Sequence, residues 1–389
     1  MRILYVHSSF VPPPLTPASD RFYLLSGKLE GDVLQPIWFG TPAEVEAMFG
    51  PGSYPSRQVG KFRYHWFLVC QYPVRLRRLA AFWFYLRKGM ALHRERRFDC
   101  IVTYGHMTAA VISGILKFLT GAKLIVEIAT SPKQVYLTDR PKPTLRERLM
   151  HVYSDCCLHI STLLLANRAH FLVPGQLSDY PLLRRVRNSV FHEFVPLSIV
   201  ERNTAKDDRE PFVLLIGAPW YLKGVDLLIA AFKNLAPDFP GVKLKLLGHF
   251  PDRAQLNEMI GGSPQIEILE AQPHPEAVRT IARSTVLVLA SRCEGMGRVL
   301  IEGMAAGVPL VGSDVGGIPY MIRDGENGFV FPSGDIPALE ARLRRLLSDP
   351  ELRRRMGQRG FERARDQLNE KVYVEEFTKM VEAAVREED

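Results

Sequence analysis

The sequence lacks the features of membrane-spanning, exported or disulfide-stabilised proteins. Its 389 residues contain no run of eighteen apolar residues, so no segment is expected to cross a bilayer as a helix. The N-terminal MRILYVHSSFVPPP has one basic residue and no small-residue cleavage site, and we expect a first strand there instead of a signal peptide. The five cysteines form no CxxC pair, which argues against a zinc site or a disulfide framework and fits a reducing cytoplasm.

The length and composition are those of a two-domain globular protein. Hydrophobic residues make up 47% and charged residues 24%, which excludes disordered, collagen-like and coiled-coil chains. A chain of this length exceeds what one hydrophobic core usually serves. The net charge of +8 is uneven, because residues 1–200 hold 25 basic and 13 acidic residues while the remainder is mildly acidic. This asymmetry indicates that one domain faces an anionic surface or substrate.

Apolar runs alternate with amphipathic stretches along both halves of the chain. In the first half we expect helices near 19–30, 73–97, 108–120 and 144–170, and strands at 2–7, 33–39, 98–105, 122–129 and 169–174. In the second half we expect strands at 212–217, 242–248, 266–269, 285–291, 308–313 and 328–331. This alternation predicts an α/β fold with parallel strands and helical crossovers. We expect two Rossmann-like domains, residues 1–200 and 201–370, facing each other across a cleft, with the polar segment 201–211 as a linker.

The most informative segment contains two glutamates separated by seven residues. Glu294 follows a predicted strand, Gly295 and Gly297 open a tight loop, and a helix is expected to begin near Arg298 with Glu302 in its second turn. Backbone N–H groups at a helix N-terminus bind anions such as a diphosphate. Two nearby carboxylates can accept hydrogen bonds from sugar or ribose hydroxyls.

Several ordered motifs of the second half resemble those of one large enzyme family. These are VLLIGAPWYLKGVDLLIAAF, LLGHF, EGMGRVLIE, GMAAGVPLV, GGIP and DGENGFVFPSGD. They are similar to the motifs of the retaining GT-B glycosyltransferases of family 4, also called glycosyl transferases group 1. The resemblance implies transfer of a hexosyl unit from a nucleoside-diphosphate sugar to an acceptor hydroxyl, with no metal and no cofactor. A nucleotide-sugar epimerase of the same fold and a non-catalytic nucleotide-sugar-binding protein are the alternatives.

The resemblance also implies roles for individual residues. Lys223 would contact the donor diphosphate, Glu294 the transferred sugar and Glu302 the ribose, with Lys223 and Glu294 as catalytic residues. The implied donor-binding residues are Gly217, Lys223, Gly248, Glu294, Gly295, Met296, Gly297, Arg298, Glu302, Gly316 and Gly317. One departure is Ala218, because the family usually has a phosphate-binding arginine directly after that glycine. Arg292 and Arg298 are the nearby cations that could replace it.

The first half matches the family's motifs less well. Its loop VPPPLTPASD at 11–20 has no Gly-Gly pair, and Ala129 stands where the family often has an active-site histidine. Ser19, Glu127 and Thr130 are therefore the acceptor-side candidates. His106 is a catalytic candidate, although a loop histidine hydrogen-bonded to backbone explains it equally well.

Basic and aromatic side chains are interleaved at residues 61–98. This composition is typical of an interfacial element on anionic lipid, and also of a crossover helix with Phe82, Leu86 and Met90 in its core stripe. No nucleic-acid-binding motif accompanies it. The expected partners are thus a nucleotide-sugar donor, a glycan or lipid-linked acceptor and the inner, cytoplasmic surface of a membrane. In the family a terminal helix, here within 371–389, packs back on the first domain.

Overall fold

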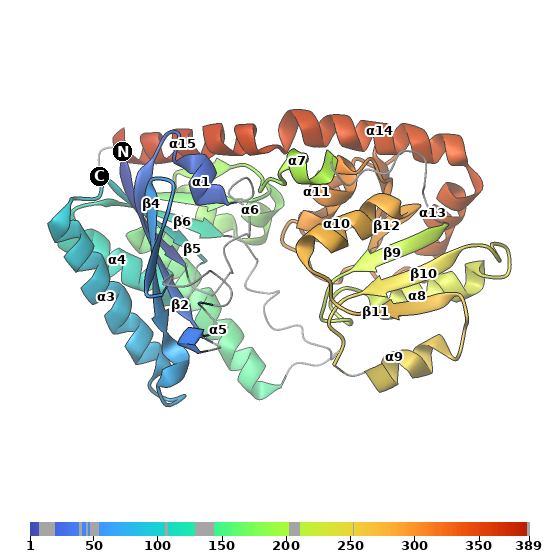
Figure 1. Cartoon of the computed structure of the whole chain (residues 1–389), viewed down its shortest axis with the longest axis horizontal. Coiled ribbons are helices and arrows are strands. Elements are labelled where there is room, and N and C mark those ends of the chain that lie inside the picture. Colours follow the sequence, from blue (N-terminus) through green and yellow to red (C-terminus); the bar gives the residue numbers. More distant parts are fainter. Residues whose placement is uncertain are drawn as a thin grey trace. The chain divides into compact units, whose positions relative to one another are not determined.

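The computed structural model describes residues 1–7, 20–38, 41–43, 46, 54–105, 108–128, 144–201, 211–251 and 253–386. The chain forms two compact units, each of which contains one sheet (Figure 1). The first unit consists of Met1–Pro132, Leu149–Phe191 and Lys371–Asp389, and the second of Lys133–Arg148 and His192–Glu370. Most of the expected linker, at 202–210, lies outside the described residues.

The first unit is built on a sheet with the strand order β3-β4-β2-β1-β5-β6-β7-β8. Its strands are β1 (Arg2–His7), β2 (Glu30–Ile37), β3 (Ser56–Val59), β4 (Phe62–Leu68), β5 (Cys100–Tyr104), β6 (Lys123–Ile128), β7 (Arg168–Phe171) and β8 (Asn188–Val190). Neighbouring strands are parallel except for the pair β3 and β4. From β4 to β7 this is the 3-2-1-4-5-6 order of a Rossmann fold.

Most helices of the first unit contribute side chains to one apolar core on this sheet. The helices of the unit are α1 (Arg21–Leu25), η2 (Val69–Gln71), α3 (Arg77–Glu95), α4 (Thr108–Thr120), α5 (Leu145–His159), the π-helical η4 (Ile160–Leu165), α6 (Gly175–Asp179), η5 (Pro181–Arg185) and α15 (Glu370–Arg386). The crossover helix α3 lies within the expected range. Its buried stripe is Ala81, Tyr85, Gly89 and Leu92. The expected stripe of Phe82, Leu86 and Met90 is therefore offset by one residue, and these side chains are only partly buried.

The edge hairpin of β3 and β4 was not expected from the sequence. Strand β4 carries Arg63 and His65, which are unusual in a largely buried strand. Both bind the buried Asp32 of β2, at 3.1 Å from Arg63 Nε and 2.8 Å from His65 Nε2. Burial raises the pKa of Asp32, but hydrogen bonds from His65 and Arg63 and the charge of Arg2 together lower it below its usual value. The polar residues of β4 thus satisfy a buried carboxylate.

The second unit has a fully parallel sheet with the order β11-β10-β9-β12-β13-β14. Its strands are β9 (Phe212–Ile216), β10 (Lys243–Leu247), β11 (Ile266–Leu269), β12 (Val286–Leu289), β13 (Leu310–Ser313) and β14 (Gly328–Phe331). This too is the 3-2-1-4-5-6 Rossmann order, with its switch point between β9 and β12. The prediction of an α/β fold with two Rossmann-like domains is confirmed.

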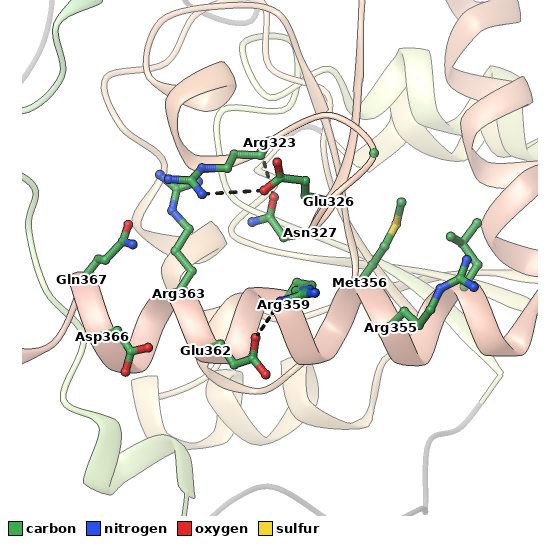
Figure 2. A pocket seen from close by; sticks show the side chains of 12 residues that line it. Arg323, Glu326, Asn327, Arg355, Met356, Arg359, Glu362, Arg363, Asp366 and Gln367 are labelled. Atoms are coloured by element: carbon green, nitrogen blue, oxygen red, sulfur yellow. Dashed lines mark hydrogen bonds and ion pairs between the residues drawn. The ribbon is translucent and has the colours of Figure 1, made fainter.

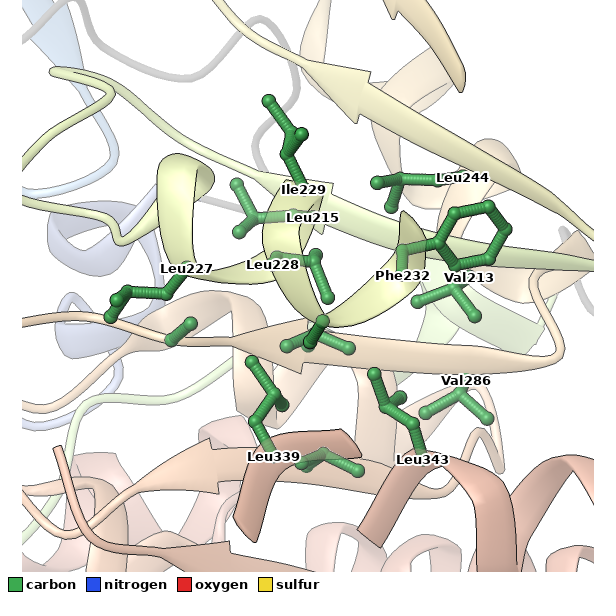
Figure 3. Close-up of a cluster of buried hydrophobic side chains, with 14 of the residues drawn as sticks. Val213, Leu215, Leu227, Leu228, Ile229, Phe232, Leu244, Val286, Leu339 and Leu343 are labelled. Atoms are coloured by element: carbon green, nitrogen blue, oxygen red, sulfur yellow. The ribbon is translucent and has the colours of Figure 1, made fainter. Parts of the chain in front are cut away.

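The second unit has eight described helices, and an apolar core holds several of them against its sheet. The helices are α7 (Leu197–Glu201), α8 (Val225–Leu235), α9 (Arg253–Ile260), α10 (His274–Arg283), α11 (Arg298–Ala305), α12 (Ile318–Met321), α13 (Ile336–Ser348) and α14 (Pro350–Gln367). Figure 3 shows side chains of α8, β9 and α13 meeting in this core, among them Leu228, Val213 and Leu339. Because α8 is anchored in this way, the turn that precedes it is held in place. No helix in the described ranges is long and apolar enough to cross a bilayer.

Candidate active site

Two loops leave the second sheet at its topological switch point. One follows β9 and contains Gly217 and Lys223, and the other follows β12 and contains Glu294 and Gly297. Strands β9 and β12 are hydrogen-bonded neighbours, with Leu215 opposite Val288, so their carboxyl ends lie at the same edge. In open parallel sheets this edge is where ligands bind, because the chain leaves the two strands toward opposite sides.

The glycines that end β9 and β10 allow a close approach of backbone and side chain. Gly217 has a φ of 138°, a conformation that favours glycine, and a Cβ there would lie 3.2 Å from carbons of the Lys223 side chain. A Cβ on Gly248 would lie 3.0 Å from the carbonyl oxygen of Gly217. Gly217 therefore leaves room for the stem of Lys223 beside the strand end, and Gly248 leaves room for the backbone of Gly217.

Lys223 and Glu294 meet between the two loops. Lys223 Nζ lies 2.7 Å from Glu294 Oε2, and the side chains are 19% and 12% exposed. The Ser291 hydroxyl donates to the same carboxylate at 3.3 Å, and the Gly295 N–H donates to its other oxygen at 3.2 Å. The structure thus brings together Lys223 and Glu294, two of the three residues that the sequence assigned to catalysis, in an ion pair that is largely shielded from solvent.

Left-handed glycines fix the turns on both sides of this pair. Gly224 precedes α8 with a φ of 67°, and a Cβ there would lie 2.0 Å from the carbonyl oxygen of Ala290. Gly297 precedes α11 with a φ of 79°, and Met296 beside it is buried. The helix α11 thus begins at Arg298, after a three-residue turn that follows Glu294. Gly316 and Gly317 form a third loop after β13, the strand beside β12.

Glu302 lies in the second turn of α11 and has a partner that sequence reasoning missed. His274 Nε2 of α10 lies 2.9 Å from Glu302 Oε1, with the two side chains 46% and 11% exposed. No motif marks His274, because the contact depends on how α10 packs against α11. One carboxylate oxygen of Glu302 is held by this contact, and the other can accept hydrogen bonds from a ligand.

The two arginines near the site differ in their availability. Arg292 forms a two-pronged ion pair with Asp226 at 2.8 and 2.6 Å and donates to the Tyr221 carbonyl at 2.6 Å. Burial lowers the pKa of Arg292, but Asp226 raises it more, to a net value above its ordinary one. Arg292 therefore braces the Lys223 turn, and its role as a replacement phosphate ligand stays a prediction. Arg298 is exposed, and its side chain contacts no carboxylate among the described residues.

The predicted acceptor side lies in the first unit and is only partly described. Ser19, Thr130 and His106 lie outside the described residues. At the switch point of this sheet, the rings of His7 on β1 and Tyr104 on β5 have centroids 4.9 Å apart. These side chains mark the edge of the sheet that carries the carboxyl ends of its strands.

Glu127 is the described member of the acceptor-side candidates, and its carboxylate is buried. It is 2% exposed and lies 2.9 Å from His170 Nδ1 and 3.5 Å from Arg21, and it accepts a hydrogen bond from the Tyr5 hydroxyl. Burial raises the pKa of Glu127, but the charge of Arg21 and hydrogen bonds from His170 and Tyr5 lower it below its usual range. The carboxylate is ionised and engaged inside the unit, which does not favour contact with an acceptor.

Comparison with known sequences links the second unit to one enzyme family. Residues 199–363 match the family described as Glycosyl transferases group 1. The alpha-D-kanosaminyltransferase of Streptomyces kanamyceticus is 35% identical over 155 residues, which cover 39% of this chain and 40% of that protein. The matched part spans about two fifths of the length of such curated relatives.

Comparison with solved structures shows that the fold of nearly the whole chain is similar to that of known proteins. A sucrose-phosphate synthase from Thermosynechococcus elongatus superposes with a TM-score of 0.75 and 17% identity, covering 98% of this chain and 99% of that one. HepE from Anabaena, solved in complex with UDP-glucose, gives a TM-score of 0.70 and 15% identity, covering 98% and 100%. Residues 199–363 thus match the glycosyl transferases group 1 family, and the chain as a whole has the two-domain parallel α/β fold of GT-B glycosyltransferases.

Proposed function

We propose that the protein is a retaining, metal-independent glycosyltransferase of the family 4 type. It transfers a hexosyl unit from a nucleoside-diphosphate sugar to an acceptor hydroxyl, in the synthesis of a cell-surface polysaccharide or glycolipid. The observation that carries this proposal is the Lys223–Glu294 pair at the switch point of the second sheet. The family match of residues 199–363 and the UDP-glucose in HepE support a nucleotide-sugar donor.

The proposed mechanism relies on electrostatic stabilisation of the leaving diphosphate. Lys223 Nζ has three N–H donors, so it can keep its contact with Glu294 and also bind a phosphate oxygen. The free N–H groups of α11 add positive potential where the negative charge develops. Glu294 accepts hydrogen bonds from hydroxyls of the transferred sugar. A donor phosphate oxygen takes the proton of the acceptor hydroxyl, so the step needs no basic side chain opposite Glu294.

A donor screen followed by product analysis tests this proposal. Calorimetric titration with UDP-, GDP-, ADP- and dTDP-sugars identifies the nucleotide, and incubation with the bound donor and candidate acceptors in EDTA shows whether transfer occurs. We expect a new glycosidic bond of unchanged anomeric configuration. Binding without turnover would instead indicate a nucleotide-sugar-binding protein, and an isomerised donor sugar would indicate an epimerase.

Replacing Glu302 by alanine is expected to weaken nucleotide binding by about 10- to 100-fold, because hydrogen bonds to a charged group contribute about 1.5–3 kcal/mol. The measurement is the dissociation constant of the nucleotide found in the screen. His274→Ala is expected to cause a smaller loss in the same direction, since His274 only orients the carboxylate.

The matched control for Glu302 is Glu351→Ala on the exposed surface of α14. The 2′-deoxy form of the same nucleotide separates a ribose contact from a general effect. In the wild-type chain, the deoxynucleotide should bind more weakly than the ribonucleotide. In the Glu302 variant, the two nucleotides should bind about equally well. An equal preference for the ribonucleotide in both proteins would contradict the assignment of Glu302 to the ribose.

The outer side of α3 supports a membrane contact in the first unit. The inner side of this helix is buried, as expected of a crossover helix, whereas Leu76, Leu79 and Trp83 are 49%, 53% and 46% exposed. Arg87 lies 5.3 Å above the Trp83 ring, and both residues line an apolar groove of about 600 Å³. We propose that this side of α3 contacts anionic lipid at the cytoplasmic face, where a lipid-linked acceptor is available. The free cysteines agree with a reducing compartment.

Leu79→Ser combined with Trp83→Ser is expected to weaken sedimentation with anionic liposomes by about tenfold or more, because two apolar side chains lose their contact with the bilayer. The control is Leu149→Ser with Val152→Ser, which removes two exposed apolar side chains from α5 in the same unit. Binding that shows no dependence on anionic lipid at low salt would refute the membrane contact.

A further inference from the structure

Arg292 joins the two loops that carry Lys223 and Glu294. It lies two residues before Glu294 in the loop after β12, and its backbone N–H donates to the Leu222 carbonyl at 2.8 Å. Its guanidinium donates to the Tyr221 carbonyl at 2.6 Å. These two carbonyls belong to the residues directly before Lys223, so both the backbone and the side chain of Arg292 hold the start of the Lys223 turn.

The same guanidinium also binds the chain after Lys223. Asp226, in the first turn of α8, accepts hydrogen bonds from it through both carboxylate oxygens, at 2.8 and 2.6 Å. The Tyr221 ring packs against the guanidinium, with 3.9 Å between the guanidinium carbon and the ring centroid. The side chains of Arg292 and Asp226 are only 21% and 23% exposed. Arg292 therefore contacts the turn on both sides of Lys223.

These contacts supply the site with geometry more than with charge. Both terminal nitrogens of Arg292 bind the turn, and the Asp226 carboxylate compensates the positive charge. A lysine ammonium group lies at the end of a flexible four-carbon stem, so its place depends on the backbone that carries it. The Gly224 N–H closes the turn by donating to the Tyr221 carbonyl at 3.2 Å. Arg292 binds that same carbonyl and so holds the backbone of Lys223 in place.

We propose that Arg292 is a positioning residue, which fixes Lys223 at the distance from Glu294 that the candidate active site needs. The contact that it maintains is the 2.7 Å between Lys223 Nζ and Glu294 Oε2. This inference rests on the proposed function and adds a residue that acts through Lys223 without touching the donor. A displacement of about 1 Å in a reacting site can lower a rate by about 10²-fold.

Two conservative variants test the geometry. Arg292→Lys keeps the positive charge but loses the planar fork that binds both oxygens of Asp226. Asp226→Asn keeps the shape of the partner and removes its charge. We expect each variant to lower kcat by about 10- to 100-fold with little change in KM, because Lys223 acts on charge that develops in the transition state. The chain should still fold, since the backbone hydrogen bond from Arg292 to Leu222 remains.

The same variants in a Lys223→Ala background separate positioning from direct binding of the donor phosphate. A residue that acts through Lys223 has nothing left to position there, so Arg292→Lys should lower kcat by no more than about twofold. A direct phosphate ligand would keep its full effect in that background. Asp226→Asn would then free the guanidinium and tighten the binding of the nucleoside diphosphate. Either of these last two results overturns the proposal.

The matched controls come from the pocket that Figure 2 shows on α14. There the exposed Arg359 lies 3.5 Å from Glu362, on the surface of the same unit. Arg359→Lys and Glu362→Gln make the same chemical changes away from the two loops and should leave kcat unchanged. An equal loss of kcat in these controls would overturn the proposal, because the loss would then follow from removing any ion pair.

A second measurement does not depend on sugar transfer. Because Glu294 holds the Lys223 ammonium group, an amine-directed acylating reagent should modify Lys223 slowly in the wild-type chain. Arg292→Lys should raise this rate about threefold or more relative to the exposed Lys233 of α8, as read by peptide mass spectrometry. An unchanged rate overturns the positioning role even where kcat falls. Faster modification in a chain whose wild-type form transfers no sugar supports the positioning of Lys223 and overturns the proposed function alone.

Discussion

Replacing Lys223 by alanine is expected to lower the rate of sugar transfer by about 10²- to 10³-fold, the usual cost of losing one preorganised group that stabilises a developing negative charge. The structure supports this size of effect, because the ammonium group is held 2.7 Å from Glu294 and the Lys223 side chain is only 19% exposed. A cation fixed in a half-enclosed position needs little reorganisation when the diphosphate leaves. The loss should appear in kcat more than in KM, since the charge develops in the transition state.

The control for this prediction is Lys233→Ala, which removes an exposed lysine from the last turn of α8 in the same unit. It should leave turnover unchanged. Glu294→Ala should also lower turnover strongly. The double variant should lose less than the product of the two single losses, because Lys223 and Glu294 act as one hydrogen-bonded pair. Unchanged turnover in both single variants would remove this pair from the active site.

Much of the second unit could be predicted from sequence because its signals are local. Most strands are short, largely apolar runs with a glycine, serine or proline at their carboxyl end, and β9 lies within one residue of its predicted range. The two glutamates and the Lys-Gly turn are short motifs, so their identification needed no knowledge of packing. That their loops adjoin followed from the strand order of a Rossmann sheet.

The features that the sequence did not reveal depend on residues far apart in the chain. Arg292 has its partner Asp226 on α8, and only the folded unit brings the two together. His274 reaches Glu302 for the same reason. Strand β4 was not predicted within its basic, aromatic segment. The sequence does not show that Asp32 on β2 pairs with Arg63 and His65 of this strand.

The one-residue offset of the α3 stripe has a different cause. Apolar residues occupy both Phe82, Leu86 and Met90 and the neighbouring series that includes Ala81 and Tyr85. Helical periodicity alone does not show which of two adjacent apolar series is buried. The buried series is the one whose side chains fit against the core. Tyr85 fits because its hydroxyl donates to the carbonyl of His7 at 2.5 Å, so its polar end is satisfied when buried.

Replacing Gly224 by alanine is expected to lower the free energy of unfolding of the second unit by about 2–5 kcal/mol. The left-handed conformation costs an alanine about 1–2 kcal/mol, and forcing atoms into a packed site adds about 1–3 kcal/mol. The clash is with backbone, because a Cβ would lie 2.0 Å from the Ala290 carbonyl oxygen. Urea denaturation followed by tryptophan fluorescence measures the loss, since Trp220 is buried in the same turn.

Gly241→Ala is the matched control, because a Cβ at that position would meet no atom within 4 Å. It should change the free energy of unfolding by no more than about 0.5 kcal/mol. Gly224 lies between Lys223 and α8 and touches the chain just before Ser291, so a shift that relieves the clash must move the Lys223 turn away from the Glu294 loop. We therefore expect the Gly224 variant to lose sugar transfer even under conditions where it remains folded. A variant that is destabilised but fully active would show that the spacing of these two loops does not control the reaction.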